Sequence, residues 1–333
     1  MKVIALTDSI APWHSFWIRF GQYIEDMPYR IEVHQDVGET ERLKRGDMLF
    51  FYRYSESWGN LAYKLRELRK KGVFITTDID DCIWEAPMGW SKVRKKNLTL
   101  AIKECNVVTC STIELYMLLS IIVPNTKILI IKNSTPKRES YSSNNKKKYD
   151  ANETILCWSG APWTRTKDLE ILRPLANWAK GNTNLRWLHV GHADNRATFA
   201  SCLGLRDIDI DIVKLNSYKK YLKNIRGNIG LAPVSSNAFN TYKSDIKLLE
   251  YSGAKMTWIA SDTPAYRELC NRWDIEGRLC KKPEEWIEHL KELLSAGKLE
   301  EECKKMQFLS NKHDHYENTP KQWEEIFKEA QNS

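Results

Sequence analysis

The amino-acid sequence predicts an α/β protein made of two doubly wound halves. Short apolar segments alternate with helical segments over the first 136 residues, and a second alternating series begins at residue 154. Between the two series, residues 137–153 are polar, rich in Ser, Asn and Lys, and lack hydrophobic periodicity. Such alternation is typical of parallel sheets covered by helices, and a polar aperiodic stretch is typical of a linker.

The first half contains short apolar segments that are rich in β-branched or aromatic residues, as buried parallel strands are. They span residues 3–7, 31–34, 48–52, 73–77, 107–110 and 127–131. Residues 60–71 are predicted to be helical, because Leu61, Leu65 and Leu68 fall on one helical face. We therefore expect a Rossmann-like N-terminal domain over residues 1–136.

The second half repeats the pattern. Strands are predicted at residues 154–158, 185–190, 208–213, 229–232 and 256–260, and helices at residues 168–175, 245–253 and 283–297. We expect a second Rossmann-like domain over residues 154–316, and a separate C-terminal segment, 317–333, in which residues 320–330 form an amphipathic helix.

Length and composition narrow the class of protein. The chain has 333 residues, enough for two α/β domains. Its eight cysteines are scattered without a C-x-x-C pair, which predicts reduced thiols in a cytoplasmic protein and no zinc site. No apolar run approaches the roughly 20 residues that span a bilayer, and the N-terminus is predicted to be a strand, not a signal peptide. The net charge of +8 is compatible with phosphate-bearing donors, an anionic membrane surface or nucleic acid.

Residues 228–261 carry the strongest functional signal. A short buried strand at 229–232 ends at Pro233, and a polar loop then leads to Ser244, which is expected to cap the helix 245–253. Lys243 and Lys247 flank the start of that helix, where backbone N–H groups point outward. This combination predicts an anion site, and a phosphate is the anion typical of such a crevice.

Six segments together resemble one enzyme family. They are Tyr52-Arg53, TTDIDDCIW at 76–84, VVTCST at 107–112, IIKNST at 130–135, ILCWSGAPWTRTKDLEIL at 155–172, and FN-x-x-KS-x-x-K-x-x-EY at 239–251, the last two in the second half. The chain thereby resembles retaining GT-B glycosyltransferases of the family-4-like kind, in their bacterial and phage branch. The resemblance implies two Rossmann-like domains that face each other across a cleft, with a C-terminal helix that crosses back to the N-terminal domain. It also implies a UDP- or GDP-sugar as donor substrate and no required cofactor.

The resemblance assigns donor-binding residues in the second half. Glu250 holds the place of the second glutamate of the family's E-x7-E pattern, which binds the ribose of the donor, whereas Tyr242 stands in place of the first glutamate. A carboxylate suits a pair of neighbouring hydroxyls, although most helix glutamates face solvent. Contacts to the donor sugar are then expected from Asn240, Lys243 or Ser244.

A basic loop follows the first strand of the second half. Arg165 falls where the family carries a cation that neutralises the diphosphate leaving group, and Lys247 is expected to share this catalytic role. A fixed cation lowers the barrier because charge develops on the leaving phosphate. Gly160 and Lys167 are expected to contact the donor in the same loop, the alternative being a solvated basic loop.

The acidic run Asp78, Asp80 and Asp81 follows the strand predicted at 73–77. An Asp-x-Asp after a strand is also the metal-binding signature of the GT-A fold. The second series of strands favours GT-B, so we expect no metal. Asp78 and Asp80 are then interpreted as contacts to sugar or acceptor hydroxyls, and Asp81 as a helix cap, while simple capping and solvation of a loop explains any one of the three equally well.

The loop after the first strand supplies candidate acceptor-binding residues. His14 is placed to orient an acceptor hydroxyl, and Trp13 or Trp17 to stack on a sugar ring or base. Arg19, at the start of a predicted helix, and Arg53, after a buried strand, are candidates for polar contacts in the same region.

The resemblance and these residues together imply a glycosyltransferase (hexosyl- or pentosyltransferase) that moves a sugar from a nucleotide-diphosphate sugar to an acceptor hydroxyl, and the resemblance implies retention of configuration. A glycan is the favoured acceptor; a hydroxymethylated pyrimidine in DNA, as modified by phage enzymes, is the alternative. A non-catalytic sugar-nucleotide-binding module stays open because Tyr242 replaces the first glutamate. The expected location is the cytoplasm of a bacterial or phage-infected cell, where peripheral membrane contact is compatible with the charge.

Overall fold

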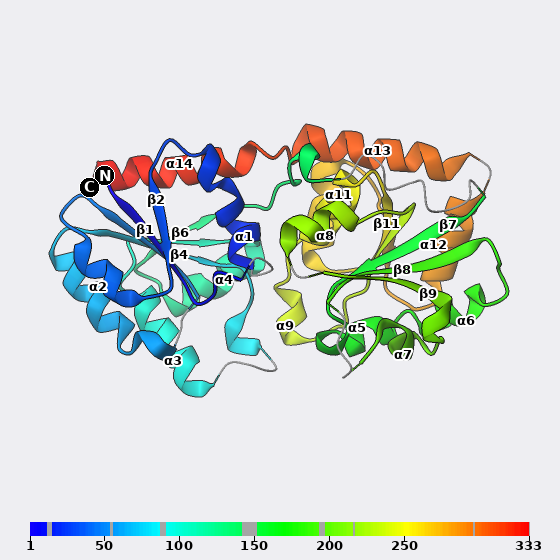
Figure 1. The fold of residues 1–333 in the computed structure, drawn as a ribbon, viewed down its shortest axis with the longest axis horizontal. Coiled ribbons are helices and arrows are strands. Elements are labelled where there is room, and N and C mark those ends of the chain that lie inside the picture. The colour runs from blue at the N-terminus through cyan, green and yellow to red at the C-terminus, as the bar shows by residue number, and fades with distance from the viewer. Residues whose placement is uncertain are drawn as a thin grey trace. The chain divides into compact units, whose positions relative to one another are not determined.

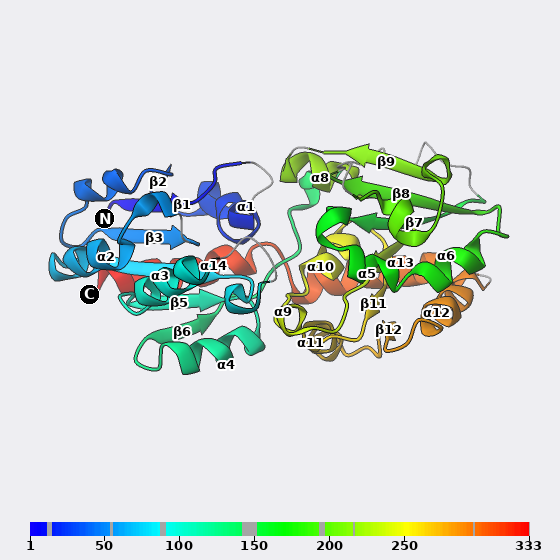
Figure 2. The ribbon, with the colours of Figure 1, turned by 90° about the horizontal axis from the view of Figure 1, so that it is seen from below.

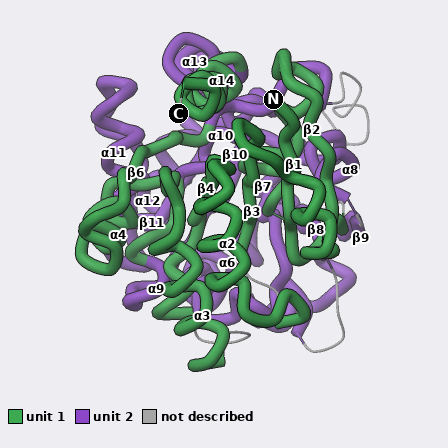
Figure 3. Tube along the Cα trace, turned by 90° about the vertical axis from the view of Figure 1, so that its left-hand side faces the viewer, with its two compact units in different colours: residues 1–133, 241–244, 317–333 green, residues 134–240, 245–316 purple. Residues whose placement is uncertain are grey.

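The computed structural model describes residues 1–11, 15–53, 56–86, 91–141, 152–192, 197–215, 217–295 and 297–332. The chain divides into two compact units (Figure 3). Unit 1 holds Met1–Asn133, Thr241–Ser244 and Glu317–Ser333, and unit 2 holds Ser134–Asn240 and Asp245–Tyr316. Each unit contains one parallel six-stranded sheet, so the predicted α/β class with two parallel sheets is confirmed.

Unit 1 has the strand order β2-β1-β3-β4-β5-β6. Its strands are β1 Val3–Thr7, β2 Ile31–His34, β3 Met48–Tyr52, β4 Phe74–Ile79, β5 Val107–Cys110 and β6 Lys127–Ile130. Its helices are α1 Ser15–Arg19, α2 Leu61–Lys70, α3 Lys92–Ile102, α4 Ile113–Ile122 and α14 Asn318–Gln331, with short 3-10 turns at Gly21–Asp26, Val37–Arg42, Glu56–Trp58 and Ile83–Glu85. Helix α14 lies on one side of the sheet and α3 on the other (Figure 1).

The C-terminal helix α14 completes the core of unit 1. Its Trp323 is fully buried, and the ring centroid lies 4.9 Å from that of Phe20 and 5.4 Å from that of Phe50. Phe20 and Phe50 stack on each other at 4.2 Å. Aromatic side chains contribute large buried areas and favour such edge-on contacts. The amphipathic pattern of the last residues therefore reflects packing against the first sheet.

Unit 2 has the strand order β12-β11-β10-β7-β8-β9. Its strands are β7 Thr154–Ser159, β8 Leu185–Gly191, β9 Ile210–Lys214, β10 Ile229–Ala232, β11 Thr257–Ser261 and β12 Leu279–Cys280. Its helices are α5 Thr166–Glu170, α6 Arg173–Ala179, α7 Phe199–Leu203, α8 Tyr218–Asn224, α9 Ala238–Thr241 (whose last residue falls in unit 1), α10 Ile246–Gly253, α11 Pro264–Trp273, α12 Glu285–Leu294 and α13 Lys298–His313. Helices α5 and α7 lie on one side of this sheet, and α11 and α13 on the other (Figures 1 and 2).

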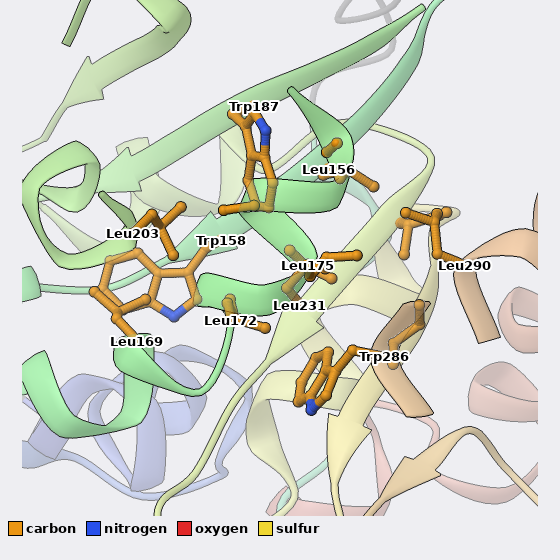
Figure 4. Close-up of a cluster of buried hydrophobic side chains, with 14 of the residues drawn as sticks. Leu156, Trp158, Leu169, Leu172, Leu175, Trp187, Leu203, Leu231, Trp286 and Leu290 are labelled. Atoms are coloured by element: carbon orange, nitrogen blue, oxygen red, sulfur yellow. The ribbon is translucent and has the colours of Figure 1, made fainter. Parts of the chain in front are cut away.

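The core of unit 2 joins the sheet to α5, α6, α7 and α12. Trp158 stacks on Phe199, and Trp286 is fully buried beside Leu172 and Leu231 in the same cluster (Figure 4). On the other side of the sheet, a Cβ on Gly230 would stand only 2.2 Å from the Tyr251 ring. Glycine at this position lets α10 pack directly on β10.

Several predicted boundaries differ from the structure. The helix expected at 168–175 is two helices, because Pro174 cannot donate the N–H that would continue the first one. Ser244 does not cap α10: the N-cap is Asp245, whose carboxylate pairs with Arg272 at 2.7 Å. The strand predicted at 73–77 extends to Ile79, so Asp78 lies inside a strand. The predicted linker 137–153 falls largely outside the described residues. In the part of the chain that the structure describes, no helix combines the length and apolarity that crossing a bilayer requires.

We expect Trp323→Ala to lower the free energy of unfolding by ~3–5 kcal/mol, because it removes the ring that packs on Phe20 and Phe50. Phe308→Ala on α13 is the matched control, since its side chain is 63% exposed, and a surface change costs less than ~0.5 kcal/mol. Urea unfolding followed by far-UV circular dichroism measures both. Equal losses in the two variants would contradict the packing role of α14.

Candidate active site

The sheet of unit 2 reverses its strand order between β7 and β10. From β7 the chain adds β8 and β9 on one side, and it then returns to add β10, β11 and β12 on the other. In open parallel sheets, ligands bind beyond the carboxyl ends of the strands at such a reversal, because the two loops there diverge. The residues that follow β7 and β10 are therefore the first place to look for a site.

Glu250 is a buried carboxylate at this edge, with 2% of its side chain exposed. Its Oε2 lies 2.6 Å from Tyr221 Oη and 3.0 Å from Lys247 Nζ. Lys247 also donates to Tyr221 Oη and lies over the Tyr221 ring. No described residue donates a hydrogen bond to Oε1. A buried charge is costly without partners; Tyr221 and Lys247 compensate Glu250 through one oxygen only.

Tyr221 links Glu250 to the end of β7. Its hydroxyl lies 2.8 Å from Ser159 Oγ, which in turn is 3.1 Å from the hydroxyl of Tyr251. Burial, reinforced by the charge of Glu250, raises the pKa of Tyr221 well above its ordinary value. The hydroxyl therefore keeps its proton and serves as a donor. Sequence reasoning missed Tyr221, because a lone tyrosine on a helix carries no motif.

Arg165 belongs to a second cluster at the same edge. Its Nη1 donates to Asp168 Oδ2 at 3.1 Å and to Asn240 Oδ1 at 3.4 Å. Asp168 Oδ1 accepts from the backbone N–H of Ser235 at 2.8 Å, and from Asn240 Nδ2 at 3.0 Å. The side chain of Arg165 is still 32% exposed. The guanidinium is thus held in place by Asp168 while part of it faces outward.

Both clusters lie at the carboxyl ends of β7 and β10. Asp168, after β7, accepts from the backbone N–H of Ser235, after β10, and Tyr221 joins Glu250 to Ser159 at the end of β7. The structure therefore places Arg165 with Asn240 in one cluster, and Lys247 with Glu250 in the other, at the same end of the sheet.

The loop after β7 approaches its neighbour very closely. A Cβ on Gly191 would stand 2.1 Å from the carbonyl oxygen of Gly160, so only glycine fits at the end of β8. The same carbonyl oxygen lies 3.0 Å from His189 Nε2. Burial lowers the pKa of His189, and the bond to Gly160 partly offsets this. Gly160 thus shapes the loop that carries Arg165.

Of three further predicted donor residues, one follows Arg165 on α5 and two lie in unit 1. Lys167 is exposed at the start of α5. Lys243 and Ser244 belong to unit 1, where Lys243 Nζ donates to Asp81 Oδ1 at 2.9 Å. This ion pair also corrects the interpretation of Asp81 as a helix cap, since the N-cap of the following turn is Cys82.

Asp78 and Arg19 were predicted to contact sugar or acceptor groups. In the structure they form a buried ion pair within unit 1. Asp78 is fully buried; its Oδ2 accepts from Arg19 Nε and its Oδ1 accepts from Arg19 Nη2, each at 2.9 Å. Arg19 was predicted at the start of a helix, but it is the last residue of α1. Its Nη1 donates to Asn133 Oδ1 at 2.9 Å. All three guanidinium nitrogens of Arg19 and both carboxylate oxygens of Asp78 are hydrogen-bonded. The structure therefore leaves neither side chain a face for sugar or phosphate.

Arg53 and Asp80 differ from that pair, because part of their bonding capacity is unused. Arg53 adopts a positive φ of 61° and donates to Ser15 Oγ at 2.8 Å, and its Nη2 lies 3.5 Å from Asp80 Oδ2. Although burial opposes it, the Arg53 charge holds the pKa of Asp80 below its ordinary value. Among the described residues, buried atoms Arg53 Nε and Asp80 Oδ1 have no hydrogen-bond partner. These groups follow β3 and β4 at the edge of the first sheet.

The remaining acceptor candidates are only partly placed. Trp17 is half-buried on α1, and its Nε1 donates to the carbonyl of Ile10 at 3.4 Å. Trp13 and His14 lie outside the described residues. Within the described ranges, no cluster of three or more His, Cys, Asp or Glu side chains has a metal-binding arrangement.

Solved structures share this architecture. A sucrose-phosphate synthase from Thermosynechococcus elongatus is 10% identical to the chain, with 99% of each chain covered and a TM-score of 0.71. The fold is GT-B. A glycosyltransferase from Rickettsia africae is 13% identical, with 99% of this chain and 98% of that chain covered and a TM-score of 0.65.

A trehalose-6-phosphate protein from E. coli bound with UDP-2-fluoro glucose is 9% identical, with 98% and 99% of the two chains covered and a TM-score of 0.65. No protein-family model and no curated protein sequence matches the chain. At these identities the likeness shows the GT-B fold alone, and the fold class predicted from the sequence is confirmed.

We expect Asp78→Asn to destabilise unit 1 by ~3–5 kcal/mol, since it leaves Arg19 as an uncompensated buried charge. Asp209→Asn is the matched control: it breaks the exposed Arg206–Asp209 pair, which is worth at most ~1 kcal/mol. Urea unfolding measures both. A stable Asp78→Asn protein that fails only in activity would restore the predicted ligand role of Asp78.

His189 predicts a pH dependence of stability. Its pKa is lowered from 6.5 in the folded protein by burial, so the unfolded chain binds the additional proton as the pH falls through about 6.5. The stabilising contribution of His189 is present above that pH and is lost as the pH falls through the lower folded value. His189→Gln should remove this part of the fall in the free energy of unfolding at low pH, whereas His315→Gln, at an exposed position, should not. Urea unfolding between pH 7 and 5, roughly the window of histidine titration, measures the difference.

Proposed function

We propose that the chain is a glycosyltransferase that transfers a sugar from a UDP- or GDP-sugar to an acceptor hydroxyl with retention of configuration. The observation that carries the proposal is the β7–β10 edge of unit 2, where two cations and a half-satisfied buried carboxylate meet. Residues 154–316 would then bind the donor and residues 1–136 the acceptor. The GT-B fold is consistent with this reaction.

Each group at the edge has a chemical task in this reaction. Glu250 Oε1 accepts a hydrogen bond from a ribose hydroxyl, because Tyr221 and Lys247 already hold Oε2. Arg165 and Lys247 stabilise the charge that develops on the diphosphate when the sugar–phosphate bond breaks. Asp168 fixes the Arg165 guanidinium in advance, so little reorganisation is needed during the reaction.

The acceptor is proposed to meet the edge of the first sheet. The side chains of Arg53 and Asp80 are 22% and 13% exposed, and their exposed atoms are proposed to contact sugar hydroxyls. A glycan, with its many hydroxyls, suits these groups. The residues Gly160, Asn240 and Lys167 are proposed to contact the donor, and Trp13, His14 and Trp17 the acceptor. The proposed location is the cytoplasm.

We expect Arg165→Met to lower the transfer rate by ~10²–10³-fold, as the loss of one stabilising donor does, and Glu250→Gln to weaken donor binding by at least ~10-fold. Glu170→Gln, on the exposed side of α5, is the control and should change neither. The measurement is nucleoside diphosphate release from a panel of nucleotide sugars, with and without glycan acceptors. The anomeric configuration of the product is then assigned by NMR.

The same panel tests the alternatives. If the protein binds a nucleotide sugar but releases no nucleoside diphosphate with any acceptor, it is a non-catalytic binding module. This alternative is tested because Tyr242 stands in place of the first glutamate of the family pattern. Release that depends on hydroxymethylated DNA would replace the glycan as acceptor. Loss of release on addition of a chelator would contradict the metal-free mechanism.

A further inference from the structure

Helix α3 of unit 1 presents a face that is both basic and apolar. Its exposed side chains are Lys92, Val93, Lys96, Leu100 and Lys103, the last at the C-cap. At 3.6 residues per turn these positions fall within an arc of about 100°. Val93 is 64% and Leu100 is 42% exposed. A soluble helix normally turns its apolar residues toward the core, so this face is unusual.

The charge on this face is not neutralised within unit 1. Residues 91–103 contain five Lys or Arg residues and no Asp or Glu. Arg94 pairs with Asp8 at 2.9 Å, and Lys95 donates to the carbonyl of Trp84 at 2.7 Å. Lys92, Lys96 and Lys103 form no ion pair with any described residue. The three lysines with no partner are those on the exposed arc.

Helix α4 adds an apolar row. Its exposed residues include Ile113, Tyr116, Met117 and Ile121, which is 80% exposed. Glu114 is the one charged residue between Ile113 and Ile122. Contiguous exposed apolar side chains of this kind mark interaction surfaces more often than free ones.

The two helices cover the same face of the first sheet. Helix α3 connects β4 to β5, and α4 connects β5 to β6, so right-handed crossovers place both on one side. Seen from below, α3 and α4 lie on the side of the sheet away from α14 (Figure 2). We call the exposed residues of the two helices the α3–α4 surface.

We propose that the α3–α4 surface binds an anionic lipid bilayer. Each lysine near anionic headgroups contributes ~1 kcal/mol, and apolar side chains gain by leaving water for the acyl boundary. Duplex DNA would pair with the lysines but leave the α4 row in water. A symmetric second copy would cover the α4 row but bring the lysines of the two copies together. A bilayer satisfies both features.

The test uses the full chain and vesicles of phosphatidylcholine with or without phosphatidylglycerol. We expect co-sedimentation only with the anionic vesicles, weakened by salt. Reversing the three charges (K92E, K96E and K103E) should lower the partition coefficient by ~100-fold or more, at ~1 kcal/mol for each lysine. The matched control is K219E, K220E and K223E on α8, the same charge change at exposed positions of unit 2, and it should keep at least most of the binding.

A second variant tests the apolar part. M117Q with I121Q keeps every lysine and should still weaken binding, and circular dichroism should show both variants folded. If M117Q with I121Q leaves vesicle binding unchanged, and the protein binds duplex DNA as tightly as it binds vesicles, the proposal would be overturned in favour of nucleic acid. A dimer that this variant dissociates, without vesicle binding, would overturn it in favour of a second copy. Equal binding to neutral vesicles, or equal loss in the α8 control, would also overturn it. No readout involves catalysis, so the outcome is independent of the proposed function.

Discussion

Buried charges at the carboxyl ends of the two sheets need partners, and the rest of the structure depends on this constraint. A carboxylate removed from water must be paired, or it costs several kcal/mol, of the order seen for unpaired buried groups. At the first sheet, Asp78 meets this requirement completely through Arg19. At the second, Glu250 meets it through one oxygen only. The difference is that both oxygens of Asp78 are hydrogen-bonded, whereas one oxygen of Glu250 has no hydrogen-bond donor among the described residues.

The same constraint explains how the cations are arranged. Arg165 is anchored by Asp168, which Ser235 and Asn240 hold in turn, so the guanidinium is fixed while part of its surface faces outward. Lys247 is tied to Glu250 one turn away on α10 and to Tyr221 on α8. Cations held in this way lose little entropy when an anion arrives. The close approach of Gly191 to Gly160 allows the loop carrying Arg165 to sit beside the sheet.

Solved GT-B structures share the fold with this chain at 9% to 13% identity. Such low identity with high coverage means that strand order and packing are retained while most side chains change. Buried aliphatic and aromatic residues can be exchanged if volume and pattern are kept. The α3–α4 surface is a feature of this chain's own side chains, and its chemistry therefore has to be argued from them.

The sequence by itself determined the α/β class, the two parallel sheets and most strands, because buried parallel strands are short apolar runs that local composition reveals. It also pointed to Arg165, Lys247 and Glu250, which follow strands in a recognisable motif. Only the tertiary structure decided which charges are compensated: it paired Asp78 with Arg19, 59 residues away, and Glu250 with Tyr221, 29 residues away. Such pairs depend on strand order and helix packing, which bring together residues whose spacing along the chain carries no pattern. For the same reason the sequence did not reveal the ion pair between Asp245, at the start of α10, and Arg272 on the next helix.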